Sequence, residues 1–77
     1  MIKELDIVVL VDDLPEHGLK KGDLGTVVLT HGELGYEVEF VSLDGETLAI
    51  MSLTAQQVRP IRRREIAQAR SVEFATQ

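Results

Sequence analysis

Apolar and charged residues alternate through Tyr36-Glu37-Val38-Glu39-Phe40, and Val41 and then Ser42-Leu43-Asp44-Gly45-Glu46 follow. Side chains of a β-strand point alternately to opposite faces, so the alternation predicts a strand with Tyr36, Val38 and Phe40 toward a core. The two glutamates then face water. Asp-Gly tolerates the positive φ angles of a tight turn and is typical of β-hairpins, so residues 47–52 are expected to return as the next strand.

Three more segments outside this hairpin predict strands: residues 5–11, 25–30 and 58–61. The first is apolar on one face and only half polar on the other, and we expect it to be covered on both sides for part of its length. Pro60 cannot donate to a ladder, so the last strand should lie at an edge or end there. Residues 53–57 are expected to form a single helical turn before it.

A charged, glycine-containing stretch, residues 12–25, separates the first two strands and predicts a long structured loop. Leu14, Leu19 and Leu24 are expected to anchor it. Five short strands, one long loop and tight hairpins are the order of an all-β, five-stranded SH3-like barrel, expected over residues 1–61. Residues 62–77 form a basic C-terminal tail that we expect to be either a frayed helix or disordered.

The chain has 77 residues, enough for one domain, and no cysteine, which excludes disulfides and thiolate metal sites. Its net charge of −5 is uneven. Residues 1–58 carry three lysines against eleven acidic residues, a net charge of −8, whereas residues 59–77 carry five arginines against two glutamates, a net charge of +3. An acidic globule with a basic tail is therefore expected.

The apolar run of residues 7–11 is too short to cross a bilayer and lacks a secretory cleavage site. No contact with a membrane is expected. The absence of cysteine fits a cytoplasmic protein, and we expect that location.

Three segments, DLPEHGLKKGDLGTVV (residues 13–28), YEVEFVSLDGETLAI (36–50) and QVRPI (57–61), resemble a family of short bacterial proteins, frequent in cyanobacteria. That family is known as a domain of unknown function, and the likeness covers roughly residues 4–61. More distantly, residues 22–28 are similar to the KOW motif of ribosomal and transcription-factor barrels and to the barrel of the nitrile hydratase β-subunit. These likenesses imply the SH3-like fold, which hosts many activities.

The sequence contains residue types that two kinds of chemical site would use. Asp12, Asp13, Glu16 and His17 fall within six residues of the long loop and offer ligands for a cation, but Leu14 and Pro15 interrupt any calcium-type ladder. We expect a solvated acidic loop with no metal and no cofactor. Catalysis is not expected either, because neither Ser42 nor Ser52 lies in a nucleophile-type turn and a small barrel fills its interior with side chains.

Nucleic-acid binding would require clustered cations, and the barrel carries a net charge of −8 with few aromatic residues. Only Arg62, Arg63 and Arg64, with Arg70, could contact phosphates. Nucleic acid is therefore not the expected partner, and the alternative for the arginine run is a solvated, solubilising end.

Another protein, either a different chain or a second copy of this one, is the partner that the sequence favours. Glu37, Glu39 and Glu46 predict an acidic face for a basic partner. A semi-apolar outer face is also expected, and a partner would bury its apolar side chains. Its members are Val8, Leu10, Leu29 and Val41. The alternative is that Ile66, Ala69 and Phe74 of the tail fold back over these residues, with tail arginines on the acidic face.

The sequence thus predicts a non-catalytic protein-interaction module, docking through its acidic face, its loop or its arginine tail. Within that class we favour a small accessory or regulatory subunit, such as the neutralising member of a bacterial two-protein pair. Two alternatives remain open. One is a KOW-type nucleic-acid or ribosome-associated factor, and the weaker one is an assembly partner of a metalloenzyme.

Overall fold

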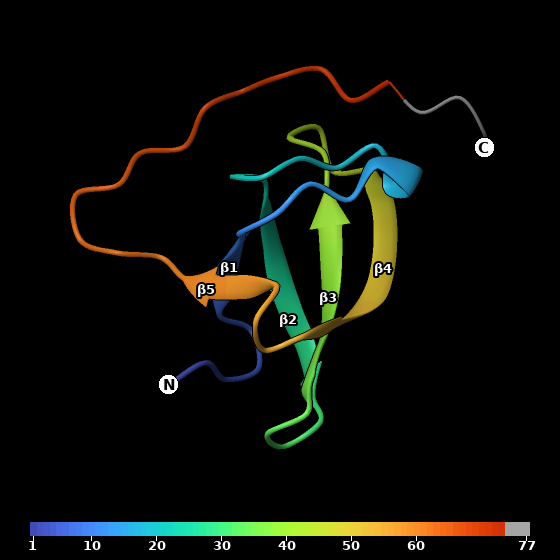
Figure 1. Ribbon diagram of the computed structural model, residues 1–77. Helices are drawn as coiled ribbons and strands as arrows, with labels where there is room; N and C mark the ends of the chain where they lie inside the picture. The colour runs from blue at the N-terminus through green and yellow to red at the C-terminus, as the bar shows by residue number, and fades with distance from the viewer. Residues whose placement is uncertain (74–77) are drawn as a thin grey trace.

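The protein is an all-β barrel whose five strands form one antiparallel sheet in the order β4-β3-β2-β1-β5. A computed structural model describes residues 1–73 (Figure 1). The strands and the one short helical element are β1 (Ile7–Leu10), the 3-10 helix η1 (Pro15–His17), β2 (Leu24–Thr30), β3 (Gly35–Val41), β4 (Thr47–Thr54) and β5 (Val58–Pro60). This is the SH3-like arrangement that the strand pattern predicts. No helix formed by the described residues is long and apolar enough to cross a membrane.

Strand β3 lies between β2 and β4 and has the two faces that its alternation predicts. It pairs with β2 through Val27↔Val38 and with β4 through Val38↔Met51. Val38 and Phe40 are buried, and Tyr36 packs partly buried against the same core. Glu37 and Glu39 lie on the opposite face, so the predicted inward and outward residues of this strand are confirmed.

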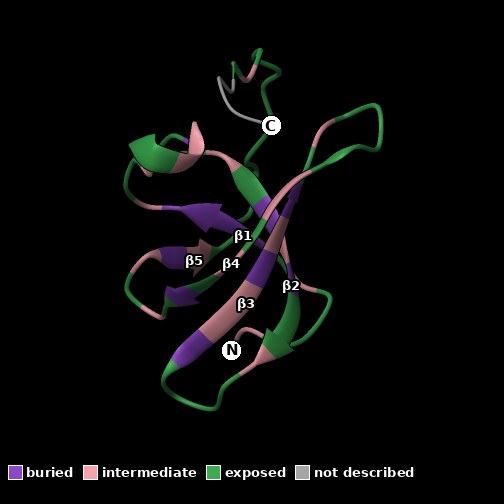
Figure 2. Cartoon of the chain, turned by 90° about the vertical axis from the view of Figure 1, so that its right-hand side faces the viewer, coloured by how far each residue is buried: buried purple, intermediate pink, exposed green. Residues whose placement is uncertain are grey.

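The core draws on every strand and on the long loop (Figure 2). It consists of Val8, Leu10, Leu19, Val27, Val38, Phe40, Leu53 and Val58. Gly25 of β2 leaves room in the core for the aromatic ring of Phe40. A Cβ atom at position 25 would lie 2.5 Å from Cγ1 of Val38 and 2.9 Å from Cε1 of Phe40. Both distances are shorter than van der Waals contact, so a side chain at this position would displace the core.

The expected exposure of Val8 and Leu10 is wrong: Val8 is 0% and Leu10 2% exposed, inside the barrel. The residue that lies exposed on β1 is Ile7, at 45%. A strand that is apolar on both faces does not reveal which face turns inward. The decision comes from pairing, since β1 lies between β2 and β5 with Val8 opposite Gly25 and Pro60. Val8 and Leu10 are therefore unavailable to a partner.

The loop between β1 and β2 is packed rather than free. Leu19 is buried, Leu14 is partly buried, and the two pair through backbone hydrogen bonds across η1. Leu24, the third expected anchor, is instead 40% exposed at the start of β2. The single turn expected at residues 53–57 is confined to residues 54–57 and does not form a helix. Strand β4 continues to Thr54, and a hydrogen bond from the amide of Gln57 to the carbonyl of Thr54 closes a tight turn.

Within residues 62–73, the C-terminal tail neither forms the expected helix nor is detached from the barrel. Residues 61–73, here called the tail strap, have no regular secondary structure and run back beside the barrel toward the η1 loop (Figure 1). A turn at Arg63 and Arg64 redirects the chain, and Arg64 has a φ of 68°. The strap follows β1 and the start of β2. Phe74, expected to fold back over the barrel, lies outside the described residues.

Candidate interaction surface

The outward side chains of β2, β3 and β4 form one continuous surface, here called the outer face. Its members are Thr26, Leu29, Glu37, Glu39, Val41, Thr47, Ile50 and Ser52. Register creates this set: Leu29 and Ser52 lie opposite Glu37, and Thr26 and Ile50 lie opposite Glu39. A bulge between Val27 and Leu29 brings Leu29 to this side. The structure therefore places Glu37 and Glu39 of the expected acidic face on the same surface as Leu29 and Val41 of the expected semi-apolar face.

Glu37 is held in one orientation by two neighbours. The Ser52 hydroxyl donates to its Oε1 atom at 2.7 Å, and Nε2 of His31 lies 3.2 Å from the same oxygen. These hydrogen bonds, from Ser52 first and then from His31, hold the pKa of Glu37 below its ordinary value. Within residues 1–73, Oε2 has no hydrogen-bond partner. This oxygen is free to accept a hydrogen bond from a cationic side chain of a partner.

Glu39 is fixed in a similar way, and aliphatic side chains surround both glutamates. The hydroxyl of Thr47 donates to Oε2 of Glu39 at 2.6 Å. Leu29, Val41 and Ile50 are 47%, 43% and 55% exposed on the same face. The outer face therefore combines oriented carboxylates with exposed aliphatic groups, the composition of a surface that can bury apolar area around a charge pair.

The remaining acidic residues lie elsewhere. Glu46 is in the hairpin before β4, where its amide donates to the Ser42 hydroxyl. In the long loop, Asp13 accepts a hydrogen bond from the amide of Lys21 at 2.8 Å, while Asp12 and Glu16 are exposed beside a half-buried His17. Across the described part of the chain, no three acidic or histidine side chains are grouped as a metal site would require.

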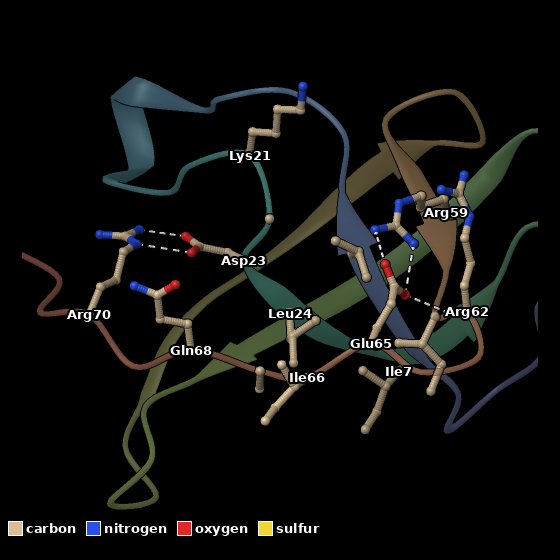
Figure 3. A pocket seen from close by; sticks show the side chains of 14 residues that line it. Ile7, Lys21, Asp23, Leu24, Arg59, Arg62, Glu65, Ile66, Gln68 and Arg70 are labelled. Atoms are coloured by element: carbon tan, nitrogen blue, oxygen red, sulfur yellow. Dashed lines mark hydrogen bonds and ion pairs between the residues drawn. The ribbon is translucent and has the colours of Figure 1, made fainter.

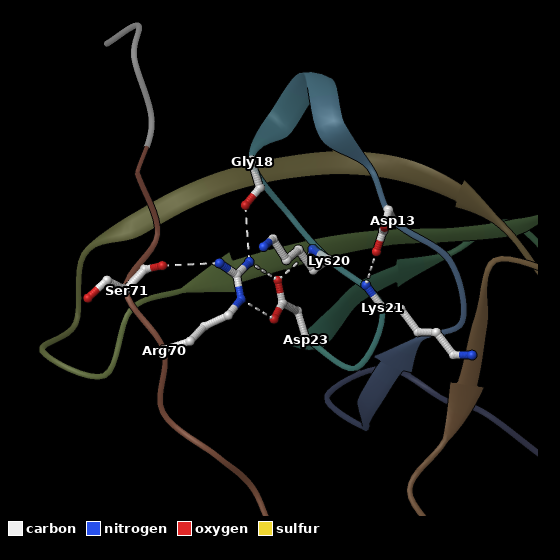
Figure 4. Close-up of polar contacts among 7 residues, drawn as sticks. All are labelled: Asp13, Gly18, Lys20, Lys21, Asp23, Arg70 and Ser71. Atoms are coloured by element: carbon white, nitrogen blue, oxygen red, sulfur yellow. Dashed lines mark hydrogen bonds and ion pairs between the residues drawn. The ribbon is translucent and has the colours of Figure 1, made fainter.

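The arginine tail contacts the barrel at two ion pairs, and the outer face takes part in neither (Figure 3). Arg59 of β5 donates through Nη1 and Nη2 to the carboxylate of Glu65, at 3.1 and 2.7 Å. Arg70 donates through Nε and Nη2 to Asp23, at 2.9 and 2.5 Å, and through Nη2 to the carbonyl of Gly18 (Figure 4). The exposed Arg62, Arg63 and Arg64 lie at the bend between β5 and Glu65.

Sequence reasoning missed Asp23, Arg59 and Glu65 as contact residues of the tail. Arg70 and Asp23 are 47 positions apart, and no spacing signal links them. Burial raises the pKa of Asp23, but the hydrogen bonds from Arg70 and from the amide of Lys20, with the charge of Arg70, hold it below its ordinary value. The hydrogen bonds from Arg59 and from the amide of Arg62 lower the pKa of Glu65 to about 2.

Acid is therefore expected to release the tail strap before it unfolds the barrel core. The pKa of Glu65 rises from about 2 toward 4.5 when the strap is free, so the attachment is complete above pH 4.5 and weakens as the pH falls toward 2. Asp23, whose pKa is also lowered, acts in the same direction. NMR shifts of the Ile66 and Ala67 methyl groups, followed during acidification, measure the release. Shifts that change well above pH 4.5, or that change only with those of the core, would contradict it.

The chain belongs to the family described as domain of unknown function DUF4926, which matches residues 4–60. The match spans all five strands and ends at the last residue of β5. Comparison with curated proteins and with solved structures finds no match.

Proposed function

We propose that this chain is a non-catalytic protein-interaction module that docks to another protein through its outer face. The observation that carries the proposal is the arrangement of Leu29, Val41 and Ile50 around Glu37 and Glu39. Burial of aliphatic groups would supply affinity, and the two carboxylates, already oriented by neighbouring hydroxyls, would select a basic partner side chain. Preorganised side chains lose little entropy on binding.

We further propose the role of a small accessory or regulatory subunit in the cytoplasm, such as the neutralising member of a two-protein pair. A barrel with a net charge of −8 over residues 1–58 attracts a basic protein through long-range electrostatics and can mask a basic surface once bound. The partner is then expected to present lysine or arginine beside apolar side chains.

The alternative partner is a nucleic acid held by the tail, and one feature favours it. Arg62, Arg63 and Arg64 are consecutive and exposed at the bend. The negative charge of the barrel repels phosphate groups, so binding of a nucleic acid would depend on these three arginines. Its affinity would fall steeply as the salt concentration rises.

Affinity capture from the source lysate separates the two, with the full chain as bait and with nuclease added to one of two matched samples. We expect a basic protein recovered in stoichiometric amount from both samples, and retained as salt is raised because apolar burial contributes to its binding. Recovery of nucleic acid alone, lost after nuclease treatment and at moderate salt, would overturn the proposal. Light scattering of the purified complex gives the stoichiometry.

A further inference from the structure

A groove of about 590 Å³ lies between the tail strap and the barrel, on a part of the surface separate from the outer face (Figure 3). Its floor is apolar: Ile7 of β1 and Leu24 of β2 are 45% and 40% exposed there, and Val9 lines it more deeply. On the strap side the lining includes Ile66 and Ala67. The tail therefore encloses this space without filling it.

The two ion pairs that close the groove run in opposite senses. At one end the barrel supplies the cation, Arg59, and the strap supplies the carboxylate, Glu65. At the other end the barrel supplies the carboxylate, Asp23, and the strap supplies the cation, Arg70. The barrel thus presents a guanidinium and a carboxylate, and an extended segment satisfies both when an acid precedes a base by five residues.

The strap satisfies this charge pattern but buries little of the apolar floor of the groove. Ile66, between the two charged residues, remains 94% exposed, and Ile7 and Leu24 stay partly exposed beside it. It is held by two side-chain ion pairs at the surface and by the hydrogen bond from Arg70 to the carbonyl of Gly18. Surface ion pairs contribute little each and are screened by salt. A segment with the same charges and better apolar contact would bind more favourably.

We propose that this groove is a second docking site, for an extended segment of a partner protein that carries a carboxylate and, five residues later, an arginine or lysine, with aliphatic side chains between. The tail strap is the built-in competitor of that segment. Complementarity to Arg59 and Asp23 defines the charges of the partner, and the exposed Ile7 and Leu24 define its aliphatic residues. A partner must displace Glu65 and Arg70 to bind.

Competition between the tail strap and an added segment determines how strongly the segment binds to the groove. A short connection keeps a tethered segment at an effective concentration in the millimolar range, so a free ligand binds weakly until the strap is loosened. Removing Glu65 and Arg70, which belong to the strap alone, leaves the barrel side of the groove intact. We therefore expect this change to raise the affinity for an added segment at least tenfold.

The test uses the full chain and a fluorescent peptide that copies residues 61–73. Binding is measured by anisotropy for the parent chain, for Glu65→Ala/Arg70→Ala, and for the matched control Arg63→Ala/Glu33→Ala, which also removes one charge of each sign. The proposal expects at least tenfold tighter binding to the first variant and parent-like binding to the control. Equal affinity for all three chains, or no binding to any, would overturn it.

Exchanging the charges of Arg59 and its partner carboxylate tests the role of Arg59 in the groove. The readout is binding that is restored and not only binding that is lost. Adding Arg59→Glu to Glu65→Ala/Arg70→Ala should abolish binding of the original peptide, and a peptide carrying Glu65→Arg should restore it. Failure of the restored pair, in a variant whose NMR spectrum shows a folded barrel, contradicts the assignment of Arg59. A parent chain that is dimeric in light scattering and monomeric after Glu65→Ala/Arg70→Ala would make a second copy the occupant and overturn the proposal of a different partner.

Discussion

Replacing Phe40 with alanine is expected to leave a large fraction of the protein, about half, unfolded at room temperature. Phe40 is among the largest of the fully buried side chains and packs with Val38 across from Gly25. Phe→Ala substitutions in cores cost about 3–5 kcal/mol through lost burial and the cavity left behind. A single core in a chain of this size supplies only about 3–5 kcal/mol of net stability, so the two quantities nearly cancel.

Chemical denaturation followed by circular dichroism measures this effect, with Leu43→Ala as the matched control. Leu43 is 91% exposed in the hairpin between β3 and β4, so its loss should change the free energy of unfolding by less than about 0.5 kcal/mol. Phe40→Leu keeps part of the volume and should fold with reduced stability. A Phe40→Ala chain as stable as the Leu43→Ala chain would show that Phe40 does not lie in the core.

The fold could be predicted where each strand had one apolar and one polar face. In β3 the alternation assigns Val38 and Phe40 inward and Glu37 and Glu39 outward, and the structure confirms it. In β1 both faces are apolar, and the choice between them depends on pairing with β2 and β5. A single sequence does not contain that information in its local pattern.

The part of the candidate surface that lies on one strand could also be predicted, whereas the part that depends on pairing between strands could not. Glu37, Glu39 and Val41 follow from the period of two in β3. Leu29 and Ser52 reach their places beside Glu37 through the register of neighbouring strands and a bulge in β2. The pairing of Arg70 with Asp23 joins residues far apart in the sequence, and both residue types are common on any exposed surface. Local reasoning therefore could not find the tail strap.

Reversing the charge of the outer face is expected to have the largest effect on function. Glu37→Lys/Glu39→Lys replaces two oriented carboxylates with like charges opposite a basic partner, and such juxtaposition costs several kcal/mol in interfaces. We expect the affinity for the captured protein to fall at least a hundredfold, about 2.8 kcal/mol at 25 °C. Both side chains point away from the core, so the barrel should stay folded.

The matched control is Glu4→Lys/Glu16→Lys, which changes the net charge equally at two exposed positions outside the outer face. It separates a local effect from the loss of long-range attraction, which acts on the association rate and weakens with salt.

The decisive measurement is the dissociation constant of the reconstituted complex for the parent chain, the outer-face variant and this control, at physiological salt. Docking through the outer face predicts that the control binds within about tenfold of the parent, whereas the outer-face variant loses at least a hundredfold. Equal affinity of the two variants would contradict the account, because the partner would then bind elsewhere on the protein.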